Sequence, residues 1–274
     1  MKKWKPQVPA NEIKYFFYRG FKIAYGYYGK SESKRTILFL YGFGGNIEMV
    51  SILADSYLSK EYSVLTVDYP GHCFSPDEMK FDLDEFVLML IELLKHLKEK
   101  EIYLIGYSLG GMVALKLYQS NMIKIHKLIM LHSAASFSYN LFKKVFYHFL
   151  GFMLRANFKF TVLTVAMQVL RDKYFTKSLL KTSREVEMHN NPESVVEYFD
   201  NIIFKDYNHI LKEIDCPTLI IGSKLDTLAT VYASKKTKAG IKDSELTIFN
   251  DIGHLSIVTR PEVISETISN FLRK

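Results

Sequence analysis

Short apolar runs alternate along the chain with segments in which apolar residues recur at every third or fourth position. The runs are typical of strands buried on both faces of a parallel sheet. They cover residues 36–40, 64–68, 102–105, 127–131, 218–221 and 245–249. The other segments have the period of amphipathic helices. They lie at 48–58, 82–98, 112–118 and 231–239, and from 261 onward. The alternation predicts an α/β fold whose mostly parallel sheet carries helices on both faces.

Local signals place the ends of several elements. Residues 15–18 and 21–28 flank Arg19-Gly20 and predict an antiparallel hairpin at the start of the sheet. Asp82, with Glu85 three residues later, predicts a helix N-cap. Pro261 is predicted as the first residue of the last helix.

The alternation stops between residues 134 and 207, where the sequence is aromatic and predicted to be helical. We therefore predict a core domain formed by residues 1–133 and 208–274, with 134–207 inserted as a helical cap or lid. Such an insertion would rise over the carboxyl ends of the strands, where ligands bind in these sheets. One cap helix can gather several apolar residues on one face, which we expect to close over the site while its lysines face solvent. These residues are Phe142, Val145, Phe146, Phe149 and Phe152.

Length and composition suit one domain with an insertion, because the chain has 274 residues, 48% of them hydrophobic. The longest apolar candidate for a membrane span, residues 145–170, is interrupted by His148, Arg155 and Lys159. The first nine residues lack the apolar core of a signal peptide. The two cysteines, Cys73 and Cys216, are too few for a disulfide framework. We expect a cytoplasmic protein.

The net charge of +7 is concentrated in one stretch, since residues 141–184 contain nine bases and one acid. No nucleic-acid-binding motif accompanies this basic stretch, so we expect no nucleic-acid partner. Two interpretations stay open. The bases can form the solvated face of a lid, or they can contact an anionic membrane or draw acidic amphiphiles to the pocket.

The chemistry of the chain centres on Gly106-Tyr-Ser108-Leu-Gly110, between the apolar run 102–105 and an amphipathic segment. A strand that turns sharply into a helix needs glycines where the backbone passes close by. The residue at the tip of the turn is then exposed at a helix N-terminus, which favours negative charge. The alternative interpretation is a tight turn with an idle serine.

Two further residues complete a candidate constellation with Ser108. Asp226 follows the apolar run 218–221, and His254 follows the last run. A serine hydroxyl needs a base to become a nucleophile, and histidine is suitable near neutral pH. An acid then fixes the histidine tautomer. The chain order Ser, Asp, His is the order found in the α/β-hydrolase fold.

Over nearly its whole length the chain resembles an α/β-hydrolase-fold serine hydrolase with a lid. The resemblance rests on Gly106-Tyr-Ser108-Leu-Gly110, the elbow of this family, and on the histidine turn Gly253-His254-Leu255. It also rests on Tyr41-Gly-Phe-Gly-Gly, which resembles the oxyanion loop, and on Asp68-Tyr-Pro-Gly-His-Cys-Phe-Ser, which resembles the family's second loop. It implies an oxyanion hole made by the backbone N–H groups of Phe43 and Leu109. It also implies that serine at the elbow excludes the dehalogenase and epoxide-hydrolase branches.

The sequence departs from the family pattern at three places. Tyr41 replaces the usual histidine of the oxyanion loop, Cys73 replaces a glycine, and Ala229-Thr230 lie where a proline is common. Each proposed role also has an alternative. Asp226 could cap the helix near Thr230, Asp251 is the rival acid, and His254 could be an ordinary loop histidine. His72 is expected to be structural, and Cys73 is either a loop filler or a reactive thiol.

We expect a carboxylic ester hydrolase, such as a carboxylesterase or an acylglycerol lipase, that forms an acyl-enzyme on Ser108. Its expected partner is a small apolar ester or acyl substrate, with no metal or organic cofactor. Thioesterase, C–C bond hydrolase and peptidase activity use the same triad and stay open. A noncatalytic receptor on this fold is the alternative from another class.

Overall fold

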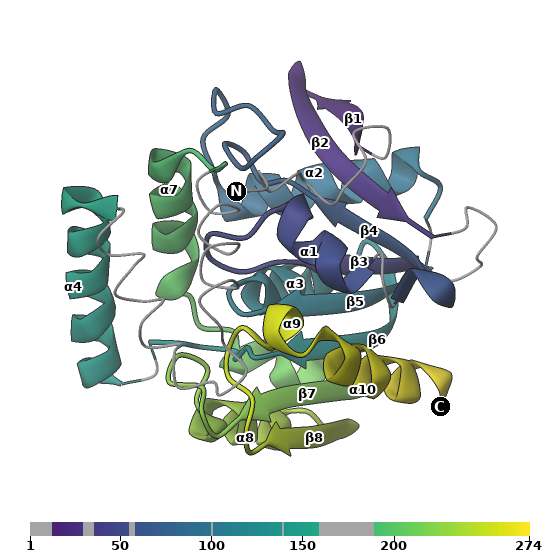
Figure 1. The fold of residues 1–274 in the computed structure, drawn as a ribbon, viewed down its shortest axis with the longest axis vertical. Coiled ribbons are helices and arrows are strands. Elements are labelled where there is room, and N and C mark those ends of the chain that lie inside the picture. The colour runs from purple at the N-terminus through teal and green to yellow at the C-terminus, as the bar shows by residue number, and fades with distance from the viewer. Residues whose placement is uncertain (1–12, 30–35, 55–57, 100, 139, 159–188) are drawn as a thin grey trace, which may run out of the picture.

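In the computed structural model of the chain, a twisted sheet lies between two layers of helices (Figure 1). The structure describes residues 13–29, 36–54, 58–99, 101–138, 140–158 and 189–274. Within them the sheet has eight strands in the order β1-β2-β4-β3-β5-β6-β7-β8. Helices α1 and α10 cover one face, and α2, α3 and α8 cover the other. The predicted α/β fold is confirmed.

The strands follow the apolar runs of the sequence. β1 and β2 form the predicted antiparallel hairpin, β2 is antiparallel to β4, and all later pairings are parallel. Strands β3, β4 and β7 are buried along their whole length, as their continuous apolar runs predict. The strands are β1 (Ile13–Tyr18), β2 (Phe21–Tyr28), β3 (Thr36–Leu40), β4 (Ser63–Val67), β5 (Glu101–Tyr107), β6 (Lys124–Leu131), β7 (Thr218–Ser223) and β8 (Ser244–Phe249).

The helices begin where the capping signals predict. The Asp82 side chain accepts a hydrogen bond of 2.9 Å from the N–H of Glu85 at the start of α2, and Pro261 is the first residue of α10. The helix predicted at 48–58 corresponds to α1, which covers Ile47–Ala54, while residues 55–57 lie outside the described residues. The helices are α1 (Ile47–Ala54), η2 (Leu58–Lys60), α2 (Leu83–His96), α3 (Gly110–Gln119), α4 (Leu141–Ala156), α7 (Pro192–Ile203), η3 (Asn208–Glu213), α8 (Val231–Gly240), α9 (Ser256–Thr259) and α10 (Pro261–Arg273).

The register of the central strands brings their carboxyl ends to one edge. Leu40 at the end of β3 pairs with Gly106, and Tyr107 at the end of β5 pairs with Leu131 at the end of β6. The loops that follow these strands therefore leave the sheet side by side. This edge carries the candidate site.

Two helices of the interruption, α4 and α7, pack on each other beside this edge (Figure 1). α7 contacts the core directly, because the Tyr198 hydroxyl donates to the carbonyl of Tyr41 across 3.2 Å. The cap boundaries after residues 133 and 207 stay predictions, and much of the predicted cap, 159–188, lies outside the described residues. Among the described helices none has the length and apolar character needed to cross a bilayer.

The predicted orientation of the apolar face of α4 is wrong. The helix has a second stripe, made of Tyr147, Gly151 and Leu154, and this stripe is the buried one. Phe142 and Phe149 face outward and are 77% and 60% exposed. Periodicity detects an apolar stripe, but it does not identify which of two stripes packs inward.

Candidate active site

The turn between β5 and α3 holds Ser108 at the carboxyl edge of the sheet. Ser108 has a φ of +54°, in the left-handed region that residues other than glycine rarely adopt. Gly106 makes the close turn possible, because a Cβ there would lie 2.3 Å from the Cα of Gly111. The strand–turn–helix context predicted around the serine is therefore present.

Asp226 follows β7, and the backbone of its own loop fixes its carboxylate. One carboxylate oxygen accepts the N–H groups of Leu228 and Ala229, each at 2.9 Å. The interpretation of Asp226 as a helix cap is wrong, because the Thr230 hydroxyl caps α8 by accepting from the N–H of Ala233. The second carboxylate oxygen of Asp226 is left to face the site.

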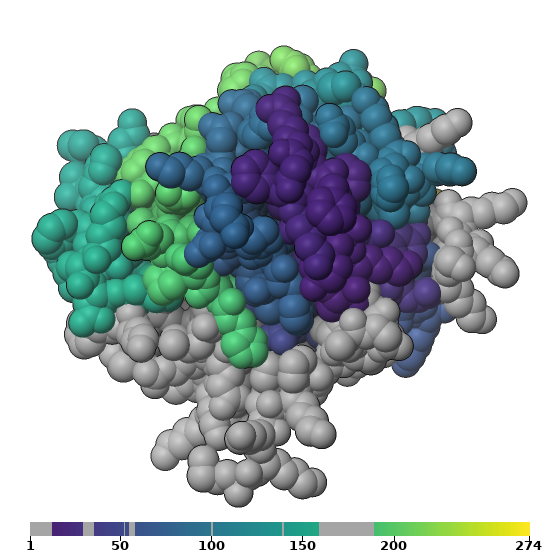
Figure 2. Space-filling view, turned by 90° about the horizontal axis from the view of Figure 1, so that it is seen from above, coloured from purple at the N-terminus to yellow at the C-terminus, as the bar shows by residue number. Residues whose placement is uncertain are grey.

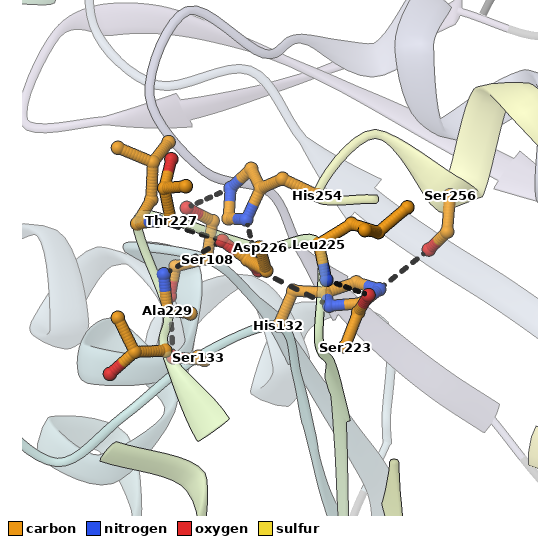
Figure 3. Close-up of polar contacts among 12 residues, drawn as sticks. Ser108, His132, Ser133, Ser223, Leu225, Asp226, Thr227, Ala229, His254 and Ser256 are labelled. Carbon is orange, nitrogen blue, oxygen red and sulfur yellow. Dashed lines mark hydrogen bonds and ion pairs between the residues drawn. The ribbon is translucent and has the colours of Figure 1, made fainter. Parts of the chain in front are cut away.

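His254 bridges the other two predicted residues (Figure 3). Its Nδ1 lies 2.7 Å from Oδ2 of Asp226, and its Nε2 lies 3.0 Å from Oγ of Ser108. The Tyr107 hydroxyl donates to the carbonyl of His254 across 2.9 Å and steadies the histidine loop. The structure thus brings Ser108, His254 and Asp226 into one row, and the acid bonded to His254 is Asp226 rather than Asp251.

The row is almost closed to solvent, with Ser108 and His254 each 7% exposed and Asp226 4% exposed. Burial by itself would raise the pKa of the Asp226 carboxyl. The charge of His254 and the polar contacts with His132 and His254 outweigh burial and hold that pKa below its ordinary value. The acid therefore stays ionised beside the imidazole, as a residue that stabilises an imidazolium must.

A second histidine, which was not predicted from the sequence, approaches the same carboxylate. His132 follows β6, is completely buried, and places Nδ1 3.3 Å from Oδ2 of Asp226. Its Nε2 lies 2.7 Å from the hydroxyl of Ser256 (Figure 3). The signal that could have found it is its position directly after an apolar run, at the sheet edge that carries Ser108.

The predicted oxyanion loop lies against the serine. A Cβ on Gly42 would come within 2.5 Å of the Cβ of Ser108, so only glycine allows this approach. In the described part of the chain, the N–H groups of Phe43 and Leu109 make none of the backbone hydrogen bonds found outside regular helices and strands. Their role as the donors of an oxyanion hole stays a prediction.

Tyr41, which replaces the usual histidine, braces this loop within a cluster of tyrosines. Its ring is fully buried and stacks on Tyr69, with centroids 4.1 Å apart. The Tyr41 hydroxyl accepts the N–H of Tyr69 at 2.7 Å, and the Tyr41 carbonyl accepts the hydroxyls of Tyr69 and Tyr198. Tyr41, in place of the usual histidine, thus supports the loop through contacts with Tyr69 and with Tyr198 of α7.

Asn190, just before α7, ties the oxyanion loop to the second loop. Its side-chain N–H₂ donates to the carbonyl of Gly44 at 2.8 Å. Its oxygen accepts from the side chain of Asn46 at 3.2 Å and from the N–H of Cys73 at 3.1 Å. A single buried amide therefore joins three segments that are distant in the sequence.

Two further candidates from the second loop, His72 and Cys73, are not part of the row formed by Ser108, His254 and Asp226. His72 is completely buried with Nδ1 3.0 Å from the carbonyl of Pro70, and burial lowers its pKa to about 4. Burial raises the pKa of the Cys73 thiol, and the charges of Asp68 and Glu48 raise it further. Cys73 is therefore a neutral thiol, which disfavours the interpretation as a reactive cysteine.

One group of described residues could hold a metal ion. The ligand atoms of Glu48, Cys73 and His189 all lie within 4.8 Å of one another, and oxygen, sulfur and nitrogen together suit Zn²⁺. His189 Nδ1 lies 2.8 Å from the Glu48 carboxylate, so the pair is also linked directly. The chemistry available to Ser108, His254 and Asp226 does not require an ion.

A mostly parallel sheet with a strained serine turn and a hydrogen-bonded histidine and aspartate defines a class of protein, the hydrolases built on the α/β-hydrolase fold. The chain belongs to the alpha/beta hydrolase fold family, whose model matches residues 35–261. The predicted resemblance is confirmed. Members of this family are hydrolases, esterases among them.

Individual relatives are distant in sequence and similar in fold. An uncharacterized hydrolase of Bacillus subtilis, YugF, is 23% identical over 96% of this chain and 99% of its own length. A putative esterase/lipase of Mycoplasma genitalium is 24% identical over 87% of this chain and 89% of its own. The solved structure of an esterase from Exiguobacterium antarcticum matches 93% of this chain and 97% of its own with a TM-score of 0.85 at 20% identity.

Proposed function

We propose that the protein is a carboxylic ester hydrolase that works through an acyl-enzyme on Ser108. The observation that carries the proposal is the row from Ser108 Oγ through His254 to Asp226, with separations of 3.0 Å and 2.7 Å. These distances lie within the reach that proton transfer needs. The esterase and lipase descriptions of distant relatives support the same reaction class.

In the first half of the reaction, Ser108 Oγ attacks the ester carbonyl while His254 Nε2 takes the hydroxyl proton. The ionised Asp226 keeps the Nδ1–H tautomer and stabilises the imidazolium. The N–H groups of Phe43 and Leu109 receive the negative charge that develops on the carbonyl oxygen. His254 then gives its proton to the leaving alcohol.

In the second half, His254 takes a proton from water, and the resulting hydroxide attacks the acyl carbonyl. The same two N–H groups stabilise the second oxyanion. His254 returns the proton to Ser108, and the carboxylic acid leaves. Burial of the row favours both halves, because charge–dipole interactions are stronger where water is excluded.

The substrate we propose has an apolar acyl or alcohol group. Phe43 of the predicted oxyanion loop packs edge-on against Phe199 of α7, with ring centroids 5.6 Å apart, so the two rings form an aromatic wall between that loop and α7. An acylglycerol and a simple carboxylic ester both fit this description. Cys73 and Cys216 are free thiols, which accords with the cytoplasm as the proposed location.

Turnover of a substrate panel tests the proposal. We expect hydrolysis of p-nitrophenyl acetate, butyrate and octanoate, with kcat/KM rising with chain length if the acyl group lies against the aromatic wall. Matched thioesters and β-diketones should be poorer substrates. Reaction with a fluorophosphonate without turnover of any compound would contradict an esterase and favour the noncatalytic receptor. Faster cleavage of the β-diketone would favour a C–C bond hydrolase.

A further inference from the structure

α4 presents a large apolar face to the outside of the molecule. In the described residues ten large hydrophobic side chains are exposed, and half of them are on this one helix. They are Leu141 and Phe142, both 77% exposed, Val145 and Phe149, both 60%, and Phe152, 63%. α4 is the outermost helix on its side of the molecule (Figure 1), and it forms the rim in the view from above (Figure 2). Soluble surfaces rarely gather such residues without a partner.

The inner face of α4 is already occupied, so the outer face is not the missing half of a core. Tyr147, Gly151 and Leu154 are buried, and the Tyr147 ring meets Phe199 of α7 at 6.3 Å between centroids. Arg155 pairs with Asp200 of α7. One side of α4 is thus packed against α7, and the opposite side is exposed.

The charge of α4 itself favours one partner. The helix contains Lys143, Lys144 and Arg155 and no acidic residue, and Lys144 is exposed beside the apolar face. The remaining bases of the basic stretch, at residues 159–184, lie outside the described residues. An apolar helix face edged with bases is the arrangement that lies in a membrane interface and is attracted to anionic lipid. Two copies of the chain meeting through this face would bring like charges together, which disfavours a dimer.

The position of α4 connects this face to the site. Lys143 Nζ donates to the carbonyl of Thr227 across 3.2 Å, and Thr227 follows Asp226. The first turn of α4 therefore touches the loop of the acid. We propose that the outer face of α4 docks on an anionic lipid surface, with its phenylalanines in the interface and its bases at the headgroups. Docking would hold the sheet edge that carries Ser108 close to the lipid.

Vesicle co-sedimentation tests the proposal. Wild-type protein should sediment with vesicles containing phosphatidylserine, less with pure phosphatidylcholine, and less with either as salt screens the charges. The variant Phe149→Ser/Phe152→Ser should lose about tenfold or more of this binding. The matched control is Tyr15→Ser/Phe17→Ser, which removes exposed aromatic rings from β1 and should bind as wild type does. Lys144→Glu should weaken only the charge-dependent part.

Both double variants should keep the circular dichroism spectrum and the turnover of a soluble acetate ester, since none of these side chains belongs to the row at Ser108. Equal sedimentation of wild type and Phe149→Ser/Phe152→Ser would overturn the proposal, as would the absence of binding to phosphatidylserine vesicles. A dimer in solution that Phe149→Ser/Phe152→Ser dissolves would also overturn it, by assigning the face to a second copy of the chain.

Discussion

Asp226 accepts polar contacts from four groups, and each restricts the carboxylate. Two backbone N–H groups hold one oxygen, and His254 and His132 approach the other. Burial would raise the pKa of the Asp226 carboxyl, but the charge of His254 and the contacts with His132 and His254 keep that pKa below its ordinary value. The four contacts together make the carboxylate the orienting centre of the row, which leads to three predictions at the scale of single residues.

Asp226→Asn should lower kcat by about ten-thousand-fold, because an amide can hold His254 in the wrong tautomer. The substitution is nearly isosteric, so the fold should be kept. Asp251→Asn is the control in the neighbouring loop and should change kcat little. Steady-state kinetics on both variants checks the choice of acid, and reversed effects would identify Asp251 instead.

The free energy of unfolding should depend on pH through the carboxylate of Asp226. A pKa held below its ordinary value adds stability above the ordinary aspartate pKa of about 3.9, and that stability is lost as pH falls through the folded value. Wild type should therefore lose more unfolding free energy than Asp226→Asn between about pH 5 and about pH 3. Urea titrations at several pH values measure the difference, and parallel curves would show that the carboxylate is not stabilised.

His132→Ala should lower kcat/KM by about tenfold, the scale of one buried polar contact. The carboxylate of Asp226 would lose one of the two imidazoles that hold it, so it would orient His254 less firmly. Ser256→Ala, which removes the Nε2 partner of His132, should give a smaller loss of kcat/KM. A loss of stability with unchanged kcat/KM would show that His132 only packs in the core.

At the scale of elements, the segment that leads into α7 belongs functionally to the oxyanion loop. The side chain of Asn190 joins the carbonyl of Gly44 to the second loop, and Tyr198 of α7 donates to Tyr41. In the proposed reaction this loop aims the N–H group of Phe43 at the developing charge and needs such support, since small displacements cost rate. The predicted cap would therefore do more than cover the site.

Asn190→Ala should reduce kcat by about tenfold to a hundredfold, because buried partners lose their bonds and the loop is no longer held. KM should change less than kcat, since the defect concerns the oxyanion. Asn201→Ala is the matched control on α7, where the side-chain amide donates to the carbonyls of Phe81 and Glu197. Equal kinetics for the two variants would show that Asn190 does not support the loop.

Elements with one buried stripe or a strong capping signal could be predicted from the sequence, and α2 with Asp82 is the clearest case. Ser108, Asp226 and His254 could be predicted because each follows an apolar run that ends at the same edge. His132 and Asn190 could not, because their roles arise from contacts between segments that pair only in three dimensions. The orientation of α4 failed for a related reason, since its two apolar stripes compete in the sequence.

At the scale of the whole molecule, one edge of the sheet collects every group that the proposed reaction uses. The core supplies Ser108, Asp226, His254 and the oxyanion loop, and α4 and α7 lie over the loops between them (Figure 1). The exposed face of α4 lies opposite the stripe that packs on α7 and faces the surroundings. Reaction and membrane docking are thus separable, and each can be tested without the other.

Trapping of the acyl-enzyme tests the central claim most directly. After rapid acid quenching of a reaction with p-nitrophenyl butyrate, intact-mass and peptide mass spectrometry should find one butyryl group per chain, on the peptide that contains Ser108. Ser108→Ala should carry no acyl group and should lose up to about a million-fold in turnover while keeping its stability. An acyl group on another residue, or a Ser108→Ala variant that retains even about a tenth of wild-type turnover, would contradict the account.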